Sequence, residues 1–217
     1  MGFDPGDPVS GGTPQLIDEV LQRNKRLDPY LGRYKGKGPK IADKGVFVQE
    51  LTDGNFDSAY RSVYNTSQSP QQYTQGFFDY KKKIIHVRPG AVAGTALHEA
   101  IHSLASPSLY TFLEQTAAQV SQDLVGVLAE GVTAFFTDCV LKDEGFGNFN
   151  DAYRDQKRKA ETLMKGLNGN PFDVTASFNF NYEFLKMATA LGLTTKQFVA
   201  LGTGGFTELA KRMKALL

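Results

Sequence analysis

The chain has 217 residues, of which 41% are hydrophobic and 22% are charged, and its formal net charge is +1 at neutral pH. This composition is typical of a globular protein with its own core, and the balanced charge gives no overall electrostatic footprint for nucleic acid. The single cysteine, Cys139, excludes an intrachain disulfide and a cysteine zinc cage. No run of about 18 or more apolar residues is present, so no membrane span is predicted. The N-terminus also lacks the layout of a signal peptide.

The first part of the chain predicts a linker followed by a helix. Residues 1–12 are rich in glycine and proline and are predicted to be a disordered linker, as would remain where a domain is excised from a longer polypeptide. Residues 13–217 are predicted to form a single domain. Its first helix begins at Thr13, has proline at its first turn and extends to about Leu27. A basic loop at 32–40 follows.

A small β-sheet is predicted within residues 45–88. Residues 45–49 form a plausible strand, and Asn55 is expected to cap a short helix after it. The segments 76–80 and 84–87 are rich in aromatic and β-branched residues and flank a lysine turn, which predicts a β-hairpin. The chain then enters the next helix directly, so the sheet is expected to pack on that helix. An edge strand at this place offers an extended peptide a partner for strand addition.

That helix contains the sequence His98-Glu99-Ala100-Ile101-His102 and is called the motif helix below. Residues four apart share one face of an α-helix, so both imidazoles can reach one metal ion while Glu99 projects beside them. This is the geometry of a catalytic zinc helix, and Zn²⁺ is the predicted cofactor. The alternative is an amphipathic helix whose histidines are hydrogen-bonded core or surface residues. The remaining histidine, His86, is predicted to be exposed or hydrogen-bonded on its strand rather than a ligand.

Glu130 is the predicted third ligand, because a catalytic zinc site usually has three protein ligands and one water. It lies in the strongly apolar helical segment 124–138, where a carboxylate is costly unless it is paired or binds a metal. Gly131 beside it permits close approach of a neighbouring backbone, for which the motif helix is the predicted partner. Glu114 is the competing ligand, and a solvated Glu130 on the polar side of its helix is the other alternative.

The same helix offers groups that can support the ligands. Asp138 lies eight residues after Glu130, about two helical turns, so it is predicted to accept the free ring N–H of a ligand histidine. Thr133 and Thr137 are lesser candidates for this role. Ordinary surface or packing positions are the alternative for all three.

These residues resemble a known class of enzymes. His98-Glu99-x-x-His102 followed by Glu130-Gly131-Val132-Thr133 resembles the gluzincin zinc metallopeptidases, in which a glutamate from a second helix completes the site. The segments 97–104 and 129–138 are most similar to the small metallopeptidase domains at the C-terminal ends of bacterial secreted toxins and type VI secretion effectors. The resemblance implies a zincin-like α+β fold, mostly helical, with the small sheet packed on the motif helix and the metal helices at about 91–142.

The resemblance also implies roles and partners. A tyrosine or histidine from later in the chain often steadies the oxyanion in such enzymes, which points to Tyr182, with Tyr153 and Tyr110 as weaker candidates and core packing as the alternative. No histidine follows residue 102, so a downstream histidine is excluded from that role. The implied partners are a peptide or protein substrate and an immunity protein. The implied location is outside the producing cell or inside a target cell, as part of a larger effector.

The remainder, residues 150–217, is predicted to be helical. Helices are expected after a cap at Asn150, over 178–191, from Thr194, and over 206–217. The predicted reaction is hydrolysis of a peptide bond, with Glu99 as general base for the zinc-bound water. A zinc amidase acting on cell-wall peptides, and a non-catalytic binding module stabilised by metal, remain alternatives.

Overall fold

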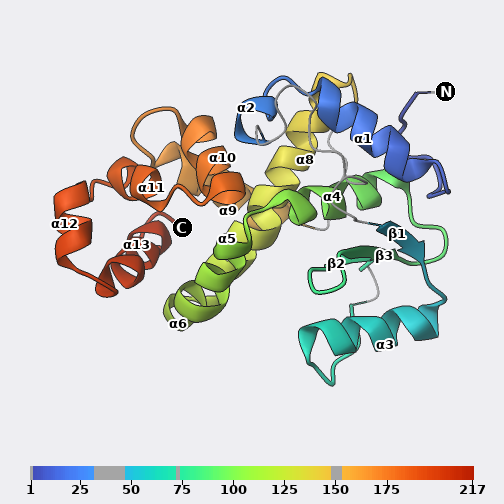
Figure 1. The fold of residues 1–217 in the computed structure, drawn as a ribbon, viewed down its shortest axis with the longest axis horizontal. Helices are drawn as coiled ribbons and strands as arrows, with labels where there is room; N and C mark the ends of the chain where they lie inside the picture. The colour runs from blue at the N-terminus through green and yellow to red at the C-terminus, as the bar shows by residue number, and fades with distance from the viewer. Residues whose placement is uncertain (1, 32–46, 72–73, 148–152) are drawn as a thin grey trace. The chain divides into compact units, whose positions relative to one another are not determined.

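The computed structural model describes residues 2–31, 47–71, 74–147 and 153–217 (Figure 1). The predicted basic loop at 32–40 and the predicted cap at Asn150 lie outside these residues. The chain forms two compact units: Met1–Leu104 with Thr137–Ala152, and Ala105–Phe136 with Tyr153–Leu217. They are called the first and second units.

The N-terminal residues differ from the disordered linker that their composition predicts. Phe3 is buried, and its ring contacts that of Phe146 edge-on at 6.3 Å. The carbonyl oxygens of Asp7 and Pro5 accept hydrogen bonds from the backbone N–H groups of Ala93 and Gly94, at 2.7 and 2.9 Å. Those N–H groups begin the motif helix and have no partner within it, so the N-terminal segment satisfies donors that would otherwise be unpaired.

The first helix is shorter than its sequence predicts. Helix α1 spans Thr13–Arg23, and the four-residue helix α2 spans Asp28–Leu31. The chain leaves the helix at Asn24, whose side chain accepts a hydrogen bond from the backbone N–H of Leu27 and donates one to Asp143. This local hydrogen bonding by an asparagine competes with continuation of the helix.

The sheet has three strands, β1 (Phe47–Glu50), β2 (Gly76–Asp79) and β3 (Ile84–Val87). Their order is β1-β3-β2, with β1 parallel and β2 antiparallel to the central strand β3. The predicted hairpin is therefore confirmed. Strand β2 forms one edge of the sheet.

Helix α3 (Asp53–Tyr64) packs on one face of the sheet. It begins before the predicted cap at Asn55, which lies inside the helix. Phe56 is fully buried and contacts the ring of Phe77 on β2 at 5.0 Å. The guanidinium group of Arg88, just after β3, lies 4.3 Å from the centre of the Phe56 ring and also pairs with Asp53 and Asp57. Aromatic packing and these ion pairs together hold α3 to the sheet.

The motif helix is α4 (Ala93–Leu104), and it covers the opposite face. Figure 1 shows the sheet lying between α3 and α4. Residues Ile85 and Val87 of β3 point away from α3 because side chains alternate along a strand, and both are completely buried. The small sheet packed on a helix and the predominance of helices confirm the predicted α+β class.

One long helical run, Gln122–Asp143, contains three labelled segments. These are α7 (Gln122–Gly126), the π-helical turn η4 (Val127–Gly131) and α8 (Val132–Asp143). By length and mean hydropathy the run resembles a membrane-spanning helix, but 72% of its most apolar window is buried in the protein. That burial is typical of the core helix of a globular domain.

The other helices of the second unit precede and follow this run. The earlier ones are α5 (Pro107–Phe112), the π-helical turn η3 (Leu113–Ala117) and α6 (Ala118–Val120). The later ones are α9 (Arg154–Lys165), α10 (Pro171–Asn181), α11 (Phe184–Ala190), α12 (Thr195–Ala200) and α13 (Gly204–Lys214). The helix predicted at 178–191 is thus interrupted, because Tyr182 ends α10 in the left-handed conformation, with φ of 55°. The predicted start at Thr194 is confirmed by a capping box with Gln197.

Candidate metal centre

Helix α4 presents its two histidines on one buried face. The side chains of His98 and His102 are 2% and 8% exposed, and their Nε2 atoms lie 3.2 Å apart. Two Zn–N bonds of about 2.0–2.1 Å at a tetrahedral angle separate their nitrogens by about 3.3–3.4 Å. The observed spacing therefore suits two imidazoles that share one ion.

Glu130 is the third candidate ligand. A carboxylate oxygen of Glu130 and one ring nitrogen from each of His98 and His102 all lie within 4.8 Å of one another. Glu130 lies in the π-helical turn η4 and is partly buried. The competing candidate, Glu114, is exposed in the turn η3 and does not belong to this group. Two imidazoles and one carboxylate form a ligand set that zinc prefers, so the residues present fit a zinc ion.

A threonine of α8 faces the other ring nitrogen of His98. Oγ1 of Thr137 lies 3.4 Å from Nδ1 of His98, at the outer limit of a hydrogen bond. When Nδ1 donates its proton to this oxygen, Nε2 keeps its lone pair for a metal ion. Thr133 and Thr137 lie three and seven residues after Glu130, so the three share one side of the helical run.

The two predicted supporting residues are both buried. Thr133 is 1% exposed and Asp138 is 5% exposed. Asp138 follows Thr137 directly and is therefore turned about 100° around the helix from it. Thr137, a lesser candidate in the sequence, faces His98. The roles of Asp138 and Thr133 beside the ligands stay predictions.

Glu99 lies beside His98 and is 5% exposed. Strand β2 passes very close to its side chain: a Cβ atom placed on Gly76 would lie 3.2 Å from Cγ of Glu99 and 2.9 Å from Cγ2 of Thr95. Only a residue without a side chain allows this approach of strand and helix. The sequence contains no signal for this contact, because Gly76 and Glu99 are separated by a turn, a strand and a helix start.

Tyr182 lies in an aromatic cluster of the second unit. Its ring contacts those of Phe112, Phe178, Phe184 and Phe206, with centroids 5.6–6.5 Å apart. Burial raises the pKa of its hydroxyl to about 12, so this group stays protonated and can act as a hydrogen-bond donor at neutral pH. Its predicted role in steadying an oxyanion stays a prediction, as do those of Tyr110 and Tyr153.

His86 differs from the exposed or hydrogen-bonded residue that its strand position predicts. It is 4% exposed, and neither of its ring nitrogens has a hydrogen-bond partner among the described residues. It packs against Phe77 on the face of the sheet that α3 covers, with ring centroids 5.0 Å apart. The metal-binding group does not include it. Burial lowers the pKa of His86 below its ordinary value, and the attraction of Asp79 opposes this only in part.

This lowered pKa makes the stability of the protein depend on pH below about 6.5, the ordinary pKa of histidine. The unfolded chain then binds a proton that the folded chain resists, so folding stability falls as the pH falls toward the folded-state pKa. Replacing His86 by phenylalanine removes this effect. As the pH falls from 7 to 5, we expect the free energy of unfolding of the variant to increase relative to that of the parent. The increase is at most about 1.4 kcal/mol per pH unit. Urea unfolding at each pH measures it; a difference that is constant with pH contradicts it.

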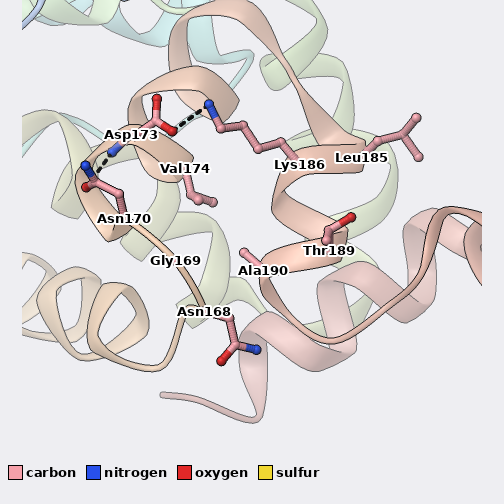
Figure 2. Close-up of a pocket in the computed structure, with 9 residues that line it drawn as sticks. All are labelled: Asn168, Gly169, Asn170, Asp173, Val174, Leu185, Lys186, Thr189 and Ala190. Atoms are coloured by element: carbon pink, nitrogen blue, oxygen red, sulfur yellow. Dashed lines mark hydrogen bonds and ion pairs between the residues drawn. The ribbon is translucent and has the colours of Figure 1, made fainter.

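A separate cavity of about 500 Å³ lies in the second unit, at the start of α10 and along α11 (Figure 2). Its charged groups are already paired: Nζ of Lys186 lies 2.7 Å from a carboxylate oxygen of Asp173 and donates to Ser177 at 2.9 Å. Asn170 caps α10 by accepting a hydrogen bond from the backbone N–H of Asp173. None of the three metal-ligand candidates lines this cavity.

Comparison with known proteins finds no match to this chain. No protein-family model matches the chain, and neither a curated protein nor a solved structure is significantly similar to it. The case for function therefore rests on the metal-binding group and on the residues around it.

Proposed function

We propose that the chain is a zinc-dependent hydrolase of peptide bonds, of the gluzincin type. The observation that carries the proposal is the convergence of His98, His102 and Glu130, whose ligand atoms lie within 4.8 Å of one another. Two imidazoles and one carboxylate leave the fourth position of a tetrahedral ion for water, as in the catalytic zinc sites of peptidases.

A zinc ion held by His98, His102 and Glu130 would supply a bound water of lowered pKa, and hence a nucleophile at neutral pH. Glu99 is the general base: its carboxylate accepts a proton from that water and later donates it to the leaving nitrogen. The burial of Glu99 and the close approach of Gly76 restrict the carboxylate to few positions. Tyr182 is the proposed hydrogen-bond donor to the developing oxyanion.

The biological setting is part of the proposal. The resemblance of residues 97–104 and 129–138 to toxin metallopeptidase domains supports a role in a bacterial secreted effector of the type VI kind. The chain would then act outside the producing cell or inside a target cell, on a peptide or protein. Its proposed binding partner is an immunity protein.

The test uses removal and return of the metal. We expect the protein loaded with one equivalent of zinc to release fluorescent peptides from labelled, denatured casein, and the chelator-stripped protein to release none. Returning one equivalent of zinc should restore the rate. An equal rate with and without metal contradicts the proposal.

A parallel incubation with purified peptidoglycan separates the substrate classes, because the same water chemistry cleaves amides in either material. Release of cell-wall peptides without cleavage of casein would identify a zinc amidase instead. Zinc bound in a closed shell of four protein ligands, with neither material cleaved, would identify a binding module with a structural metal.

A further inference from the structure

Gly131 is the point at which helix α9 contacts the π-helical turn η4. A Cβ atom placed on Gly131 would lie 2.3 Å from the carbonyl oxygen of Gln156 and 3.2 Å from Cβ of Ala160. The first distance is far below any normal contact, and the atom it meets belongs to the backbone of α9, so it cannot swing away. The predicted close approach at Gly131 is confirmed, but its partner is α9 and not the motif helix.

A second glycine repeats this arrangement one turn earlier. Gly126 lies five residues before Gly131, the spacing of a π-helical hydrogen bond, and it also faces Gln156. There, however, an added Cβ would lie 3.9 Å from Cγ of Gln156, an ordinary contact. An ion pair of 2.7 Å between Lys159 of α9 and Asp123 of α7 fixes the same crossing from its exposed side. Of these two glycines, only Gly131 is in tight contact with the backbone of α9.

Glu130 precedes Gly131 directly and is the candidate ligand within this turn. A π-helical turn holds one residue more than an α-helical turn, so it sets the direction in which the following side chains point. Such turns are rare, and the packing around them must hold them in place. Helix α9 is the element packed most closely on η4. Its position and the direction of the Glu130 side chain are therefore linked through one backbone contact.

We infer that α9, seated on Gly131, positions the Glu130 carboxylate for metal binding, so that Gly131 and the backbone of Gln156 are positioning residues of the metal site. The inference rests on the proposed metal site and adds that its affinity for the metal depends on the position of α9. A displacement of α9 should weaken metal binding although no ligand is changed.

The test compares the zinc dissociation constants of Gly131→Ala and Gly126→Ala, measured by competition with a chromophoric chelator. Both substitutions exchange glycine for alanine on the same face of one helical run, so their effects on helix propensity match. We expect Gly131→Ala to bind zinc about 10- to 100-fold more weakly than the parent, as is typical when support for a ligand is lost. Gly126→Ala should stay within about three-fold.

The absorption spectrum of the cobalt-substituted protein gives a second readout that a general loss of stability would not move. We expect the visible bands of Gly131→Ala to shift from those of the parent toward those of Glu130→Ala, because a misplaced carboxylate is partly lost from the metal. Equal zinc affinity and an unchanged cobalt spectrum in a folded Gly131→Ala protein would overturn the inference while leaving the metal site intact. A parent protein that binds no zinc would instead overturn the proposed function.

A gentler pair of variants decides the matter if Gly131→Ala does not fold. Lys159→Ala removes the ion pair to Asp123, which loosens the crossing, and also a pair with Asp155 inside α9. Arg158→Ala removes a pair with the same Asp155 but leaves the ion pair across the crossing in place. We expect Lys159→Ala to weaken zinc binding about two- to five-fold, in keeping with the strength of an exposed ion pair. Arg158→Ala should leave zinc binding unchanged, and equal affinities in the two variants would contradict the inference.

Discussion

Replacing Glu130 by alanine is expected to lower zinc affinity by about 60- to 700-fold. Structural zinc sites with four ligands bind with about 10–16 kcal/mol, so one ligand contributes roughly 2.5–4 kcal/mol, and every 1.4 kcal/mol is a factor of ten. His98 and His102 would remain and would hold the ion weakly through their paired nitrogens. Competition with a chromophoric chelator measures the change.

Glu114→Ala is the matched control for this variant. Glu114 also lies in a π-helical turn of the second unit, but it is exposed and lies outside the metal-binding group. Glu114 is also the alternative to Glu130 that the sequence offers as third ligand. We expect its removal to leave zinc affinity unchanged; the opposite ranking of the two variants would assign the third ligand to Glu114.

Replacing Glu99 by glutamine is expected to separate metal binding from turnover. The amide has nearly the same size as the carboxylate and cannot accept the proton of water, so kcat should fall by about 10²- to 10⁴-fold, the usual contribution of a general base. Zinc content should stay at one ion per chain, because Glu99 is not among the three ligand candidates. Hydrolysis of labelled casein, together with metal analysis of the same sample, measures both quantities.

Ser103→Ala is the control for Glu99→Gln. Ser103 lies on the same helix, and its hydroxyl donates to the carbonyl oxygen of Ala100. We expect parental turnover and zinc content in this variant. Unchanged turnover in Glu99→Gln would exclude Glu99 as the base, whereas loss of zinc would show that Glu99 supports the metal site instead.

Much of the first unit follows from local patterns in the sequence. The aromatic and β-branched residues of 76–80 and 84–87 and the lysine turn between them predict the hairpin, since each strand needs only its neighbour to pair. The pairing of His98 with His102 is likewise local, because a single helix turn brings their nitrogens to 3.2 Å. Glu130 was found by a different argument, the cost of a carboxylate in an apolar helix.

Other features depend on contacts that no local pattern contains. The N-terminal segment is ordered because its carbonyl groups meet the first N–H groups of α4, about 85 residues later in the chain. The break at Tyr182 accompanies packing of its ring among four phenylalanines, which outweighs the helical periodicity of 178–191. His86 appears polar and accessible in its strand, yet α3 covers that face of the sheet.

The partners of single residues at the metal centre were the hardest features to predict. The sequence identified Gly131 as a site of close approach but assigned it to the motif helix, because the path of α9 is set by packing over the whole second unit. Spacing along the helix favours Asp138 as the acceptor of a histidine proton, with Thr137 as a lesser candidate. The structure places Oγ1 of Thr137 3.4 Å from Nδ1 of His98, and the role of Asp138 stays a prediction.

X-ray absorption at the zinc edge tests the central claim most directly, on the purified chain loaded with one equivalent of zinc. We expect one tightly bound ion per chain with two imidazole nitrogens at about 2.0–2.1 Å and two oxygens at about 2.0–2.2 Å, one from Glu130 and one from water. Loss of one oxygen ligand in Glu130→Ala should complete the assignment. A protein that binds no zinc, or a shell that contains a single imidazole or the sulfur of Cys139, would contradict it.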